Sequence, residues 1–106
     1  MSEEYFIIQT ISEVVKEDNQ NSPIDLAAIG GVIDFSITNP VGSGAAVTVN
    51  VNGTDIQVLQ PGDPMFMLGG YHNCLRRDKI TFSFVGGTGV ANCYYNKRMS
   101  PANCLI

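Results

Sequence analysis

The stretch VIDFSITNPVGSGAAVTVNVNGTDIQVL, residues 32–59, decides the fold class. Apolar and polar side chains alternate through it: Ile33, Phe35 and Ile37 share one predicted face, and Val47, Val49 and Val51 repeat the pattern. Alternation with a period of two is typical of half-buried strands. Asn52-Gly53 then precedes a third alternating run, Thr54–Leu59, which contains Ile56 and Val58. Asn-Gly between two such runs predicts a tight hairpin, because both turn residues must adopt positive φ.

The pattern continues toward the C-terminus. Lys79–Val85 places Ile80, Phe82 and Phe84 on one face, and Gly86–Gly89 predicts a second hairpin that leads into Val90–Tyr95. Strand alternation there predicts that one of the two tyrosines at its end points inward and the other outward. Runs spaced by roughly 8–12 residues and separated by Gly, Asn and Pro are typical of all-β domains. We therefore predict an all-β domain over residues 24–106, a small antiparallel β-sandwich of jelly-roll or Ig-like type.

Residues 1–23 differ from the rest and are predicted to form an N-terminal arm and linker. The segment Tyr5–Val15, YFIIQTISEVV, has apolar residues at helical spacing, yet it is rich in β-branched and aromatic residues, which favour strands. We expect it to be extended. Lys16–Pro23 is polar and contains turn-forming residues, so we expect a loop or linker there.

Charge is divided unevenly along the 106 residues. Residues 1–34 hold seven acidic residues and one basic residue (net −6), whereas residues 35–106 hold three acidic and five basic residues (net +2). An acidic segment of this kind can meet a basic surface on its own molecule or on a neighbour. The formal net charge of the whole chain is −4, which argues against nucleic acid as the main partner.

Several classes of protein are disfavoured. The longest apolar runs, Tyr5–Ile8 and Met65–Leu68, fall far short of the ~20 residues of a membrane span, so no membrane partner is expected. The acidic start MSEE does not resemble a secretory signal, so synthesis in a reducing cytoplasm is expected. The odd set of cysteines is then interpreted as thiols: Cys74, Cys93 and Cys104.

Candidate chemistry is sparse. His72 and the three cysteines could supply a zinc set, but the chain has no closely spaced Cys pair, and small buried hydrophobic residues are the preferred interpretation of the cysteines. Gly86-Gly87-Thr88-Gly89 lacks the Gly-Lys-Ser/Thr ending of a phosphate-binding loop. We expect no catalytic residue, no cofactor and no metal, and hence not an enzyme.

The sequence also resembles a known family in layout. The resemblance is to the small β-sandwich virion proteins of tailed phages, namely head decoration (auxiliary capsid) proteins and the capsid-bound bases of head fibres. It covers about residues 30–98 and is carried by Asp34–Asn39, Val47–Thr54, Leu59–Gly62, Asp78–Phe84 and Val90–Tyr95. It implies a domain that docks on the capsid lattice, often as an oligomer, and decorates or cements it.

The functional prediction is a non-enzymatic virion structural protein made in the host cytoplasm. Its expected partners are a capsid or other virion protein and further copies of itself, and exchange of the N-terminal arm is the favoured mechanism. The candidate interface residues are Tyr5, Phe6, Ile7, Ile8, Ile11, Arg76, Arg77, Lys97 and Arg98. The alternative is a carbohydrate-binding or adhesive module, in which Tyr71, Tyr94 and Tyr95 would replace the missing tryptophan as stacking residues.

Overall fold

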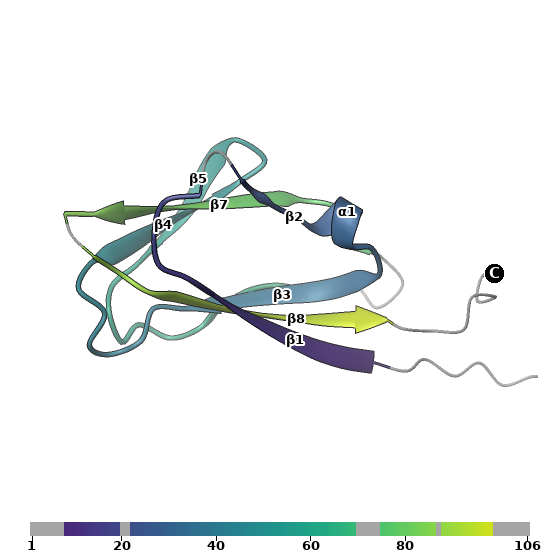
Figure 1. Cartoon of the computed structure of the whole chain (residues 1–106), viewed down its shortest axis with the longest axis horizontal. Helices are drawn as coiled ribbons and strands as arrows, with labels where there is room; N and C mark the ends of the chain where they lie inside the picture. Colours follow the sequence, from purple (N-terminus) through teal and green to yellow (C-terminus); the bar gives the residue numbers. More distant parts are fainter. Residues whose placement is uncertain (1–7, 20–21, 70–74, 87, 99–106) are drawn as a thin grey trace, which may run out of the picture.

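A computed structural model describes residues 8–19, 22–69, 75–86 and 88–98. This part of the chain consists of strands joined by turns and one single-turn helix (Figure 1). In chain order the elements are β1 (Ile8–Val15), β2 (Ile24–Asp25), α1 (Leu26–Ile29), β3 (Val32–Thr38), β4 (Ala46–Val51), β5 (Thr54–Leu59), β6 (Phe66–Leu68), β7 (Lys79–Val85) and β8 (Ala91–Arg98).

The strands form two antiparallel sheets of four strands each, with the orders β1-β8-β3-β6 and β2-β7-β4-β5. The two sheets make the two layers of a sandwich (Figure 1). Each sheet contains strand pairs whose numbers add up to nine: β1 with β8 and β3 with β6 in one, β2 with β7 and β4 with β5 in the other. This pairing arises when one long hairpin is rolled up on itself, which is the jelly-roll topology. The predicted all-β sandwich is confirmed, and the strand order identifies the jelly-roll alternative.

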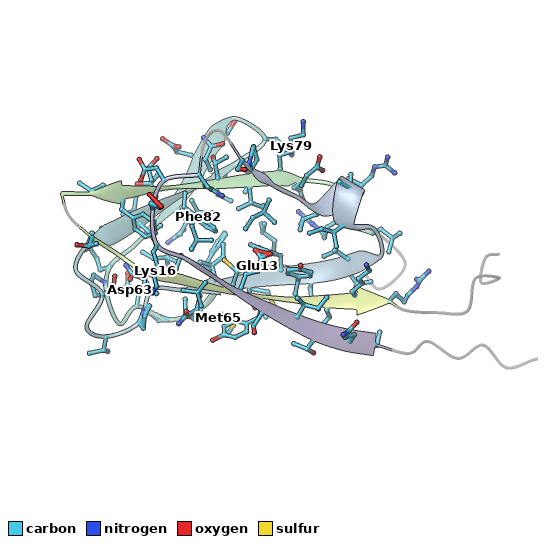
Figure 2. The ribbon with its side chains drawn as sticks, viewed as in Figure 1. Glu13, Lys16, Asp63, Met65, Lys79 and Phe82 are labelled. Carbon is cyan, nitrogen blue, oxygen red and sulfur yellow. The ribbon has the colours of Figure 1, made fainter. Side chains whose placement is uncertain are left out.

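The hydrophobic core fills the space between the two sheets. Phe35 and Tyr95 stack with ring centroids 6.0 Å apart, and Phe82 faces them from the other sheet (Figure 2). Tyr95 is buried whereas Tyr94 is half-buried on the outer face, so the prediction of one inward and one outward tyrosine is confirmed. The core members with no exposed surface are Leu26, Val32, Phe35, Ile37, Val47, Val49, Ile80, Phe82, Ala91 and Cys93.

Two strands depart from the simple alternation. The pairing of β3 with β8 shifts between Val32 and Asp34, so Val32 is fully buried and Ile33 is only half-buried. In β5 the pairing shifts opposite Ile56, and Leu59 rather than Val58 faces the core. Val58, opposite Thr48, points away from the core and is 49% exposed, while Ile56 is the bulged residue and is 37% exposed.

The two predicted hairpins have different outcomes. Asn52 and Gly53 have φ of 54° and 93° and connect β4 to β5, which confirms the first. The second is wrong: β7 and β8 belong to different sheets, so the segment that joins them crosses from one layer to the other. Glycine-rich segments make both kinds of connection, and local sequence does not distinguish a hairpin from a crossover.

The extended conformation predicted for the N-terminal segment is confirmed over the eight residues of β1, which form an edge strand of the first sheet. Lys16–Pro23 then leads from the first sheet to the second, because β1 and β2 lie in different sheets. Among the described residues no helix is long and apolar enough to cross a membrane.

Candidate interface

Strand β1 has an open backbone edge. It pairs with β8 from Ile8, opposite Arg98, to Val15, opposite Ala91, with no shift of register, and β8 is its only strand neighbour among the described residues. The opposite side of β1, which we call the β1 edge, therefore presents a row of backbone N–H and C=O groups. Such a row can pair with a strand of another chain.

The side chains of β1 alternate between the two faces of the sheet. Ile11 and Val15 pack against the core, whereas Ile8 and Val14 are 46% and 57% exposed on the outer face. The β1 edge is thus flanked by apolar side chains on both faces. Glu13 is the exception, because it lies on the inner face between Ile11 and Val15 and is half-buried there (Figure 2).

Glu13 affects two buried groups on β8. Cys93 lies directly opposite it in the pairing, and burial, reinforced by the Glu13 carboxylate, raises the pKa of the Cys93 thiol to about 12. Burial and then the same carboxylate also raise the pKa of Tyr95. Both groups therefore stay protonated and uncharged at neutral pH.

The edge of β7 is closed by side chains. β4 pairs with β7 on one side. On the other side β2 pairs only with Ile80 and Lys79, which would leave the later residues of β7 without a strand neighbour on that side. Instead, the Asn19 side-chain carbonyl accepts a hydrogen bond from the Phe82 amide at 2.6 Å, and the Asp18 carboxylate accepts one from the Phe84 amide at 3.0 Å. These two side chains take the place of a neighbouring strand.

The remaining two edges are protected by their geometry. β5 carries the bulge at Ile56, and β6 has only three residues. Bulges and short edge strands are common means of preventing edge-to-edge pairing. Of the edges described, only the β1 edge is long, regular and uncapped.

Basic residues from two distant segments meet at one end of the sandwich. The Arg76 amide donates to the Val32 carbonyl at 2.7 Å, and the Arg98 amide donates to the Gly31 carbonyl at 2.8 Å. Lys97 lies opposite Val32 in the pairing of β8 with β3. We call Arg76, Arg77, Lys97 and Arg98 the basic end. Because Ile8 pairs with Arg98, β1 begins at the basic end.

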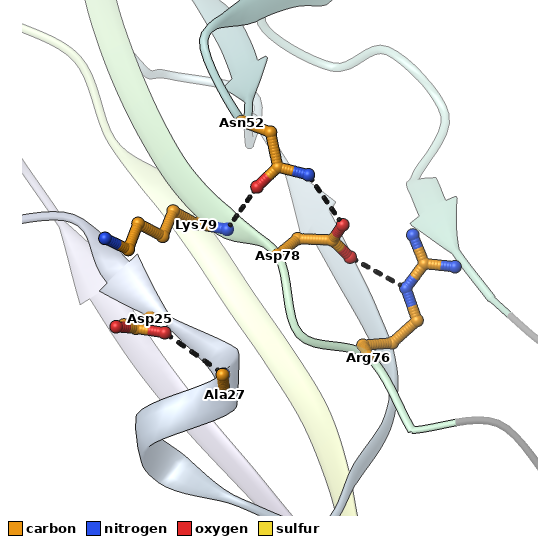
Figure 3. A network of polar contacts seen from close by, with 6 residues as sticks. All are labelled: Asp25, Ala27, Asn52, Arg76, Asp78 and Lys79. Atoms are coloured by element: carbon orange, nitrogen blue, oxygen red, sulfur yellow. Dashed lines mark hydrogen bonds and ion pairs between the residues drawn. The ribbon is translucent and has the colours of Figure 1, made fainter.

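The side chain of Arg76 is held within a polar network. Its Nε donates to Asp78 at 2.9 Å, and the other oxygen of Asp78 accepts from the Asn52 amide at 3.0 Å (Figure 3). The Asn52 carbonyl in turn accepts from the Lys79 backbone amide at 2.9 Å. Arg76 therefore helps to order the hairpin turn between β4 and β5, while its neighbour Arg77 is exposed.

A polar row crosses the outer face of the first sheet. Thr10 donates to the Asn96 carbonyl at 2.6 Å, and the Asn96 amide group donates to both oxygens of Asp34 at 2.9 and 3.1 Å. Tyr94 lies beside this row, between Ser12 and Ser36 in the pairing. This face combines hydroxyl, amide and aromatic groups.

The structure describes six of the nine predicted interface residues: Ile8, Ile11, Arg76, Arg77, Lys97 and Arg98. It brings the basic pairs 76–77 and 97–98 together and places Ile8 on the outer face beside them, whereas Ile11 faces the core. Cys93 is buried in the core, as expected for a small hydrophobic residue. Within the described ranges, no group of three or more His, Cys, Asp or Glu side chains could hold a metal ion. The predictions for Tyr5, Phe6, Ile7, Tyr71, His72, Cys74 and Cys104 lie outside the described residues.

Sequence reasoning missed the contribution of Glu13, Asp18 and Asn19. The alternation around Glu13 contained a signal, since the polar residue occupies a position of the same parity as the apolar Ile11 and Val15. No comparable signal marks Asp18 and Asn19, because their partners are more than sixty positions away.

No family model matches the chain, and a search of curated proteins found no match either.

Proposed function

We propose that this chain is a non-enzymatic structural protein of a tailed-phage virion, made in the host cytoplasm, that decorates or cements the capsid through protein–protein contacts. The observation that carries the proposal is the β1 edge: a regular strand of eight residues that is uncovered on one side by the described part of the chain, while the other described edges are capped, bulged or short. A domain that protects most of its edges and leaves one open is suited to strand addition by a partner chain.

The distribution of charge around the start of β1 also supports the proposal. The basic end combines two cationic pairs beside the start of β1, and the sequence before β1 contains Glu3 and Glu4. Complementary charges of this kind fix orientation and accelerate encounter between copies or with an acidic capsid surface. The jelly roll also recurs in viral capsid proteins, which is an argument by analogy of fold only.

The test is attachment to particles of the phage that encodes the chain. We expect the protein to co-purify with intact particles in many copies and to rebind particles from which it has been removed. Reversing two charges of the basic end, with Arg77→Glu and Lys97→Glu together, should weaken rebinding, most clearly at low salt. Lys16→Glu, beyond the other end of β1, is the matched control and should rebind normally. Absence of the chain from purified particles would refute the proposal.

A carbohydrate-binding role is the second candidate, favoured by Tyr94 on the polar outer face. Tyr95 is excluded as a stacking residue because it is buried in the core. Tyr94 offers a half-buried aromatic ring beside the polar row of Thr10, Asn96 and Asp34. Binding of the full chain to a glycan array, abolished by Tyr94→Ala, would favour this function over capsid attachment.

A further inference from the structure

The sequence of β1 is complementary to itself. In an antiparallel pair the side chains of the two strands share their faces only when the numbers of opposed residues add up to an even value, since side chains alternate along each strand. We propose that two copies of this chain associate through antiparallel pairing of their β1 edges about Ile11, so that the residue numbers of each opposed pair add up to 22. The pairing joins two four-stranded sheets into one continuous sheet across a two-fold axis. It rests on the proposed function in that it names one partner of the β1 edge: a second copy of this chain.

In this register each opposed pair matches in polarity. On the outer face, Ile8 meets Val14 of the second copy and Thr10 meets Ser12, so the two exposed apolar side chains of the strand cover each other. On the inner face, Ile11 meets Ile11 and Gln9 meets Glu13. Apolar pairs and amide–carboxylate pairs directly opposite each other stabilise a sheet.

Registers shifted from this one oppose polar and apolar side chains, or two like charges. A slip of two residues one way places the Glu13 carboxylate opposite Ile11, and a slip of four places it opposite the Glu13 of the second copy, where like charges repel. A slip of two the other way opposes Ile8 to Ser12 and Gln9 to Ile11. Glu13 therefore disfavours slips in one direction, and Ser12 and Gln9 disfavour the slip in the other. The inward-pointing charge of Glu13 also limits indiscriminate pairing of the edge.

The other described edges do not offer a comparable surface. Asp18 and Asn19 occupy the edge of β7, the bulge at Ile56 distorts β5, and β6 has three residues. β1 is paired in register along its whole length, about 26 Å at the usual rise of a strand.

The first experiment measures the mass of the full chain by sedimentation equilibrium at several concentrations. We expect a reversible dimer. Gln9→Glu creates two like-charge pairs with Glu13 across the axis and should raise the dissociation constant roughly tenfold at low salt. Adding Glu13→Gln transposes the pair and should restore the wild-type constant. Gln57→Glu makes the same change on the β5 edge and should leave the dimer unaffected. The proposal would be overturned by a monomer at all concentrations. It would also be overturned if the variant with both Gln9→Glu and Glu13→Gln kept the raised dissociation constant of Gln9→Glu.

The second experiment tests the register by disulfide formation, with Cys74 and Cys104 replaced by serine. Ile11→Cys lies on the axis, where directly opposed Cα atoms are about 4.5–5.5 Å apart, within disulfide range. Ser12→Cys is offset from its own copy by about 8 Å, outside that range, and is the matched control. Efficient cross-linking at position 11 but not at 12 supports the register. Cross-linking at position 12 alone, or at neither position, contradicts it.

The results separate this inference from the proposed function. A monomeric chain that still attaches to capsids would refute the β1 pairing alone. A dimer with the expected cross-link that never appears in purified particles would refute the virion role and leave the pairing intact.

Discussion

One connecting segment, residues 16–23, directly follows β1 and runs along the edge of β7, yet the β1 edge and the edge of β7 differ in how they are covered. The amides of Phe82 and Phe84 on β7 are capped by the side chains of Asn19 and Asp18. β1, directly before that segment, is regular and has no such cap among the described residues. The difference teaches that an open edge in this fold is not an unavoidable end of a sheet. The same segment that closes one edge leaves the other available, and that contrast makes β1 the candidate contact surface.

Removing the cap on β7 should have the largest effect. With Asp18→Ala and Asn19→Ala combined, the Phe82 amide loses a partly buried hydrogen bond and the Phe84 amide an exposed one. Because unsatisfied backbone groups cost about 1–3 kcal/mol each, and water can reach Phe84, we expect the free energy of unfolding to fall by about 2–3 kcal/mol. Urea unfolding followed by circular dichroism measures the change.

The control for the cap is Glu17→Ala. It neutralises a side chain in the same segment that is exposed, so stability should change by less than about 0.5 kcal/mol. The variant that lacks Asp18 and Asn19 should also form larger species, since a second edge becomes open. Equal stability of the capped and uncapped proteins would mean that Asp18 and Asn19 do not protect β7, and the contrast between the two edges would disappear.

The second prediction concerns stability at alkaline pH and depends on Cys93, which lies opposite Glu13 of β1. Burial, and then Glu13, raise the pKa of Cys93 from 9.0 to about 12, so the folded protein keeps a proton that the unfolded chain releases above pH 9.0. Stability should therefore fall as pH rises from 9.0 toward 12, by up to about 1.4 kcal/mol per pH unit, or about 2 kcal/mol by pH 10.5. Tyr95, whose pKa is raised by the same causes, acts in the same direction at higher pH.

Urea unfolding of the wild type and of Cys93→Ala at pH 8 and pH 10.5 isolates the thiol. The variant should be less stable at pH 8, since a buried side chain is shortened, but its stability should decline less on going to pH 10.5. If the free energy of unfolding fell equally in the two proteins, then ionisation of Cys93 would not be the cause of the pH dependence.

The sequence predicted the features of the fold that depend on local patterns, but not the partners of the two edges. Period-two alternation identified β3, β4 and β7 and the Asn52-Gly53 hairpin, because these depend on contacts close in sequence or on one buried face. The pairing of β1 with β8 joins residues at opposite ends of the chain, and the cap on Phe82 reaches back to Asn19. Local patterns carry no information about such partners. The bulges beside Ile33 and Ile56 likewise came from pairing geometry rather than from residue type.

The candidate interface was only partly accessible for the same reason. The basic pairs at 76–77 and 97–98 were visible as charges, but their meeting at Gly31 and Val32 depends on the pairing of β8 with β3 and on the hydrogen bond from Arg76 to Val32. Exposure of Ile8 and burial of Ile11 follow from the side of the sheet that each occupies. Alternation predicts that they differ, but it does not say which one is exposed.

The smallest effect on stability, and the most specific test of the open edge, comes from Glu13→Val. Valine on the inner face between Ile11 and Val15 adds apolar contact in place of a half-buried carboxylate, so the free energy of unfolding should rise by about 1 kcal/mol. The pKa of Cys93 should stay raised, since burial, the larger cause of its elevation, remains when Glu13 is removed.

Assembly should change in the opposite sense to stability. Without the inward charge, slipped registers of β1 no longer place a carboxylate against Ile11 or against its own copy, and alternative pairings become similar in free energy. We expect sedimentation to show a broad distribution of larger species instead of a discrete dimer, although the monomer is more stable. Glu13→Gln also removes the charge but keeps a polar group that is unfavourable opposite Ile11, so its distribution should stay narrower than that of Glu13→Val. If Glu13→Val gave a single, tighter dimer, then the apolar residues alone would define the register. Glu13 would in that case serve only to limit the strength of pairing at the β1 edge.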